Sequence, residues 1–105
     1  MSGQARHNAV KVRRAGQLAS WLVALAARVA DEALALSPDD PAARADLATA
    51  AALARSVLHA ARACVARVEE LGLPNEPFDA ASARIDKHEA TIEIAARRLA
   101  DEVGR

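Results

Sequence analysis

The sequence predicts an all-α protein, an antiparallel up-down-up bundle of three long helices. Alanine supplies 29 of the 105 residues and runs of β-branched residues are scarce, which favours helix throughout. Apolar residues recur at intervals of three and four, as on the buried face of a helix. Most glycines and prolines fall where helices should end, so short connections would make neighbouring helices antiparallel.

We expect a flexible segment over residues 1–7, followed by one domain over 8–105 whose first helix covers about 8–36. This helix carries two apolar stripes. The main stripe holds the larger side chains: Leu18, Leu22, Leu25, Val29 and Leu36. The second set lies on another side: Val12, Val23, Ala27, Ala30 and Leu34. Together the stripes make the helix apolar around about half of its circumference.

The stretch "LSPDDPAARADL" separates the first two helices. Pro38 disfavours helical geometry at Ser37, so the first helix should stop there. Asp40 suits the N-cap of the second helix, and Pro41 suits its first position, where a missing N–H costs nothing. The acids of this stretch therefore indicate a turn rather than a metal site.

The second helix should cover about 41–71 and the third about 79–103. "ELGLP" predicts the end of the second, because Gly72 can adopt the left-handed C′ conformation and Pro74 prevents continuation. Asp79 is the expected N-cap of the third helix, with Phe78 packing back on its first turn. Glu93 and Arg97 should form a pair on its outer face.

Charge and cysteine content narrow the functional classes. Fourteen basic and fourteen acidic residues give no net charge, which argues against a general polyanion binder. Cys64 is single, so no intrachain disulfide is possible and a reducing compartment is compatible. The longest apolar stretch, residues 20–27, is too short to span a bilayer, and no signal peptide is evident. We expect a soluble, cytoplasmic protein that needs no cofactor.

Two residues could carry chemistry. His88 lies at the edge of the third helix's apolar stripe, where an imidazole could bind haem, a metal or a small molecule. It has no Glu-x-x-His companion, so a histidine bonded to water or a neighbour is the simpler interpretation, and we predict no metal site. Cys64 is mid-helix without a histidine partner and should be a small buried apolar residue. The sequence shows no catalytic grouping, and we predict no enzyme.

The segment "RHNAVKVRR" concentrates positive charge at the start of the first helix. Its bases are Arg6, Lys11, Arg13 and Arg14, and no acid occurs before Asp31. Cations are unfavourable at a helix N-terminus, so something should compensate them. We expect acids at the adjoining ends of the other helices, Glu69 and Glu70 first, to do so. Nucleic-acid phosphates are the alternative.

Self-association is the function that the apolar surplus favours. The first helix offers more apolar surface than two neighbours usually cover, and only 24 large apolar side chains stabilise the whole chain. A homodimer is the default closure, and another protein partner is possible in its place. The candidate interface residues are Val12, Trp21, Val23, Leu34 and Ile94. Trp21 fits an interface anchor and the edge of the core equally well.

At "SPDDPAARADLATAAALARS" and "LGLP" the chain resembles computationally designed helical bundles and helical-repeat proteins. These join idealised alanine-rich helices through similar proline-containing turns. The resemblance covers the two loops and the helix patterning, and it implies a scaffold or assembly component without natural activity. The twelve arginines, the free Cys64 and the N-terminal segment depart from that pattern and look like a bacterial protein of high GC content.

Overall fold

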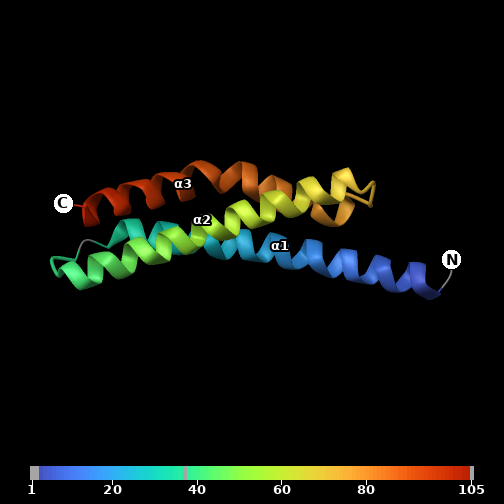
Figure 1. Ribbon diagram of the computed structural model, residues 1–105, viewed down its shortest axis with the longest axis horizontal. Coiled ribbons are helices and arrows are strands. Elements are labelled where there is room, and N and C mark those ends of the chain that lie inside the picture. Colours follow the sequence, from blue (N-terminus) through green and yellow to red (C-terminus); the bar gives the residue numbers. More distant parts are fainter. Residues whose placement is uncertain (1–2, 37, 105) are drawn as a thin grey trace.

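The computed structural model describes residues 3–36 and 38–104, and the predicted three-helix bundle is confirmed. The helices are α1 (Gly3–Ala35), α2 (Pro41–Glu70) and α3 (Asp79–Val103), with a short 3-10 helix, η1 (Glu76–Phe78), before α3. No strand occurs among the described residues. Each helix packs on the other two, which gives a rod of 59 × 19 × 17 Å (Figure 1).

The helix ends follow local chemistry. The N–H of Ala42 donates to the Asp40 carboxylate, and Pro41 opens α2, as predicted. The stop predicted at Ser37 lies outside the described residues. At the other end, Gly72 adopts a φ of +67°. Its N–H donates to the carbonyl of Glu69 while that of Leu73 donates to the carbonyl of Val68, the pattern of a Schellman motif.

Two predicted boundaries differ from the structure. α1 begins at Gly3, so residues 3–7 are helical rather than part of a flexible segment. α3 begins directly after η1, and Asp79 lies inside the helix instead of capping it. The 3-10 turn supplies part of what a cap would, because the N–H of Asp79 donates to the carbonyl of Glu76. Phe78 is buried, as expected.

The core is built largely from alanine on α1. Its buried residues are Gly16, Ala19, Ser20, Val23, Ala26, Ala27, Ala30 and Ala33. Larger side chains come from the other helices, with Leu58 and Ile92 fully buried. A second cluster at the α2–α3 turn joins Ala19, Val68, Phe78 and Ala81. Small side chains on α1 let the other two helices approach its backbone closely.

The N-terminal part of α1 extends beyond the bundle. Every residue from Gly3 to Lys11 is exposed. In Figure 1 this blue segment runs past the turn that joins α2 to α3. In the described part of the chain, no helix is both long and apolar enough to cross a membrane.

Candidate functional site: the outer face of α1 and the polar clusters

Part of the main apolar stripe of α1, together with Trp21 beside it, faces away from the bundle. Leu18, Trp21 and Leu25 lie on consecutive turns and are 55%, 57% and 41% exposed. Leu22 is half-buried, Val29 is half-buried and packs against the main core cluster, and Leu36 is exposed just after the helix ends. The exposed side chains form a surface, which we call the outer face of α1, defined by Leu18, Trp21 and Leu25.

Three of the five predicted interface residues belong to the bundle interior instead. Val23 is completely buried. Val12 and Leu34 are half-buried and pack against the two core clusters. Close helix packing selects the stripe with small side chains for the inside, which places Val23 against α2 and α3. Trp21 is exposed, as an interface anchor would be.

Ile94, the fifth predicted interface residue, is also exposed but isolated. It is 45% exposed on α3, and charged residues on the same helix share its surroundings. These neighbours are Arg97, Arg98, Asp101 and Glu102. A single apolar side chain among charges is ordinary protein surface. It contrasts with the three-turn outer face of α1.

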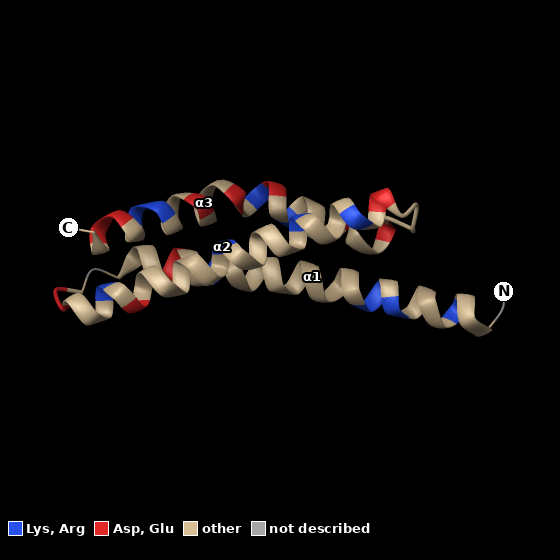
Figure 2. Ribbon diagram, in the orientation of Figure 1, with Lys and Arg blue, Asp and Glu red and all other residues tan. Residues whose placement is uncertain are grey.

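The basic residues of α1 do not pair as predicted. Glu70 pairs with Arg67 on its own helix, with Nη1 and Oε2 3.2 Å apart. Among the described residues, Arg6, Lys11, Arg13 and Arg14 take part in no ion pair. Arg6 and Arg13 line a depression together with Glu76 of η1, but no ion pair between them occurs among the described residues. Figure 2 shows this half of α1 bearing only basic positions among its charges.

The main polar cluster joins α2 to α3. Glu93 accepts hydrogen bonds from Nε of Arg55 at 2.8 Å and from Nε2 of His59 at 2.7 Å. The bond from His59, followed by the charge and hydrogen bond of Arg55, lowers the pKa of the Glu93 carboxyl below its ordinary value. Glu93 of α3 therefore pairs with residues of α2, and the predicted pair with Arg97 on its own helix is not formed among the described residues. Arg62 and Glu89 form a second bridge between the same helices.

This cluster does not form a hydrolase triad. Ser56 lines the same surface depression as His59 and Glu93. Its hydroxyl donates to the carbonyl of Ala52 at 3.1 Å, and no hydrogen bond joins it to His59. A nucleophile needs its base within hydrogen-bond reach. The arrangement instead acts as a set of interhelical contacts on an open surface.

In the described part of the chain, neither His88 nor Cys64 belongs to a group of potential metal ligands. His88 is half-buried on α3. The described residues contain no group of three or more potential metal ligands, either around His88 or around the aspartates between α1 and α2. Cys64 is exposed rather than buried, so the prediction of a small core residue is wrong. The α2 positions that do enter the core are Ala51, Ala54, Leu58, Ala61 and Val68.

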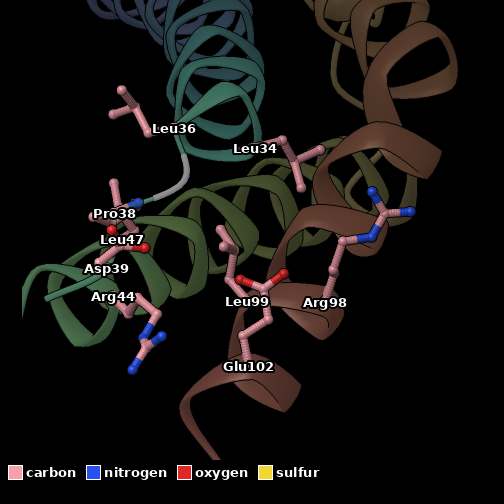
Figure 3. A pocket seen from close by; sticks show the side chains of 9 residues that line it. All are labelled: Leu34, Leu36, Pro38, Asp39, Arg44, Leu47, Arg98, Leu99 and Glu102. Atoms are coloured by element: carbon pink, nitrogen blue, oxygen red, sulfur yellow. The ribbon is translucent and has the colours of Figure 1, made fainter. Parts of the chain in front are cut away.

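A depression at the first turn is lined by all three helices. Leu34, Leu47 and Leu99 contribute one leucine from each helix (Figure 3). Four charged side chains, two of each sign, complete it: Asp39, Arg44, Arg98 and Glu102. The balanced charges favour neither an anionic nor a cationic ligand. Nothing in this lining selects a substrate class.

Comparisons with protein-family models, with curated proteins and with solved structures find no match for this chain. The assignment of function therefore depends on the surface itself. Of the residues predicted for an interface on α1, Trp21 is exposed, whereas Val12, Val23 and Leu34 are buried or half-buried. The signal that could have found the exposed face is the run Leu18, Trp21, Leu25, which has the three- and four-residue spacing of a helix–helix seam and contains the only tryptophan of the sequence.

Proposed function

We propose that this protein is a non-enzymatic helical bundle that works by self-association, as a structural or interaction module. The observation that carries the proposal is the outer face of α1, where Leu18, Trp21 and Leu25 remain exposed on three successive turns. Aromatic and leucine side chains grouped in this way are typical of interface centres. The designed-bundle resemblance of the two turns agrees with such a role.

The distribution of large apolar residues supports the same conclusion. Ten of the 24 Leu, Val, Ile, Phe and Trp side chains are exposed, and five of these ten lie on α1 or directly after it. Completing the burial of three side chains from each of two copies would contribute on the order of 6 kcal/mol before the cost of association. This contribution is modest, so concentration is the variable to test.

Sedimentation equilibrium over a wide concentration range tests the proposal. We expect mass to rise from monomer to dimer, and the emission of Trp21, the sole tryptophan, to shift to shorter wavelength over the same range. Leu25→Ser should weaken association at least tenfold. Ile94→Ser is the matched control, since Ile94 has similar exposure outside the face, and it should leave association unchanged. A wild-type chain that stays monomeric at several hundred micromolar would refute the proposal.

The basic residues near the N-terminus of α1 make nucleic acid a second candidate partner. Arg6, Lys11, Arg13 and Arg14 form a basic segment on a helix that extends past the bundle. If they bind phosphates, fluorescence anisotropy of labelled duplex DNA should rise with added protein, and the affinity should fall steeply with salt. Replacing Arg6 and Lys11 by glutamine should then reduce binding to any DNA sequence.

A further inference from the structure

We infer that α1 packs antiparallel against α1 of a second copy, about a two-fold axis at the level of Val23, with Arg14 of each copy paired with Glu32 of the other. The inference rests on the self-association proposed above and deepens it by assigning the partner, the orientation and the register. Four observations support it: the spacing of the exposed residues, their symmetry about Val23, the charge order along α1 and the extension of its N-terminus.

The exposed face has the spacing of a two-helix seam. Its members follow one another at intervals of four and three residues: Arg14, Leu18, Trp21, Leu25, Arg28 and Glu32. At about 100° per residue, all six lie within roughly a quarter of the helix circumference. This is the pattern by which one helix packs along another in a coiled coil. The apolar residues are central, and the charged residues flank them on both sides.

The exposed residues are also arranged symmetrically about Val23. Trp21 and Leu25 lie two residues to either side of it, and Val10 and Leu36, both exposed, lie thirteen to either side. In an antiparallel pair centred at Val23, Trp21 therefore opposes Leu25 of the other copy and Val10 opposes Leu36. A two-fold interface must be self-complementary in this way.

The charges obey the same symmetry. Arg14 and Glu32 lie nine residues to either side of Val23, on the same side of the helix because about five full turns separate them. Glu32 approaches Arg28 at 3.7 Å, but both side chains are about three-quarters exposed, so the carboxylate can also accept Arg14 of the second copy. Leu18 then opposes Arg28, whose aliphatic stem can cover it.

The order of charges along α1 selects the antiparallel orientation. Four of the five Lys and Arg residues of α1 lie in its N-terminal half, and both of its acidic residues lie near its C-terminal end. Neither helix terminus therefore carries the charge that its dipole favours. An antiparallel copy brings acids to the bases and opposes the two dipoles. A parallel pair would set Arg14 beside Arg14 and align both basic segments.

The extension of α1 beyond its own bundle fits this arrangement. Residues 3–11 form helix that is exposed along its whole length, with Val10 at the edge of a depression shared with Pro74 and Pro77. An isolated helix of that length is marginal in water. Since the two copies run in opposite directions, the extension of each copy would lie along the far end of the other. The seam would then cover almost the full length of α1.

Charge reversal at the two ends of the seam tests the register. Arg14→Glu and Glu32→Arg should each weaken homodimerisation roughly tenfold, because each places two like-charged pairs across the two-fold axis. Mixing the two variant chains should restore association to near wild type, since every pair in that heterodimer is then opposite in sign. Arg13→Glu and Asp31→Arg are matched controls that carry the same charge changes on adjacent residues pointing about 100° away, and they should have little effect.

Disulfide trapping tests the orientation. In a Cys64→Ser background, chains with Arg14→Cys mixed with chains with Glu32→Cys should cross-link to each other and not to themselves. Cross-linking of Arg14→Cys chains among themselves would overturn the antiparallel arrangement. So would failure of the charge-reversed mixture to restore association.

The outcomes separate this inference from the proposal on which it rests. If the wild-type chain does not associate, self-association itself is wrong. If it associates and Leu25→Ser weakens it, but neither the charge-reversed mixture nor the mixed cysteine chains behave as expected, the outer face of α1 stands and the antiparallel register is wrong.

Discussion

Gly16 of α1 lies against the backbone of Pro77. A Cβ added at Gly16 would overlap the carbonyl oxygen of Pro77. The contact brings η1 onto α1 and positions Phe78 over the second core cluster. A glycine that weakens a helix elsewhere is here the residue that lets the loop approach.

Gly16→Ala should therefore destabilise the bundle, although alanine favours helix more than glycine. The methyl group would force η1 away from α1, and we expect a loss of about 1–3 kcal/mol in the free energy of unfolding. Urea unfolding followed by circular dichroism measures this. Gly3→Ala is the control, because nothing lies within 4 Å of its added Cβ, and it should be neutral or slightly stabilising. Equal effects at both positions would contradict the close approach.

Leu58 and Leu53 lie on the buried side and the exposed side of α2, respectively. Leu58 is completely buried, whereas Leu53 is 63% exposed. Leu58→Ala should lower the free energy of unfolding by about 2–5 kcal/mol, because it leaves a cavity among the three helices. Leu53→Ala should change it by less than about 0.5 kcal/mol. A large loss at Leu53 in dilute solution would show that α2 is rotated relative to this structure.

Glu93 should make stability depend on pH. Its pKa is lowered in the folded state by the hydrogen bond from His59 and by Arg55, so its contribution is present above the unfolded-state pKa of about 4.3. That contribution is lost as pH falls through the lower folded-state pKa. Urea unfolding between pH 7 and pH 3 should therefore show a smaller acid-induced loss for Glu93→Gln than for wild type.

The same substitution should cost no more than about 1 kcal/mol at pH 7, since the cluster is partly exposed. Glu102→Gln is the control, because Glu102 is exposed and lies outside the ion pairs of the described residues. It should keep the wild-type pH dependence. Identical acid profiles for Glu93→Gln and wild type would contradict the assigned role of Glu93.

Cys64 should be fully available to reagents in the native state. Because the side chain is exposed, alkylation by iodoacetamide in buffer should proceed at nearly the rate measured in urea. Leu58→Cys in a Cys64→Ser background is the matched control, and its thiol should be protected many-fold until the chain unfolds. Strong native-state protection of Cys64 would place that side of α2 in an interface.

Local chemistry accounts for what was predicted correctly. Asp40 and Pro41 begin α2, and Gly72 ends it, because each acts through its own backbone geometry and that of adjacent residues. The third helix has one dominant apolar side, and that side is buried at Ile85, Ile92 and Leu99. Errors arose where contacts are not local, as at Glu93, whose partners Arg55 and His59 come from another helix.

The sequence by itself determined three alanine-rich helices, their turns and a surplus of apolar surface on the first. Only the tertiary structure decided which side of α1 is inside. Hydrophobicity alone ranks the leucine stripe of Leu18 and Leu25 above that of Val23 and Ala27, but three helices pack most closely on the stripe with the smallest side chains. Leu18, Trp21 and Leu25 are exposed for that reason, and the proposed interface therefore consists of these residues.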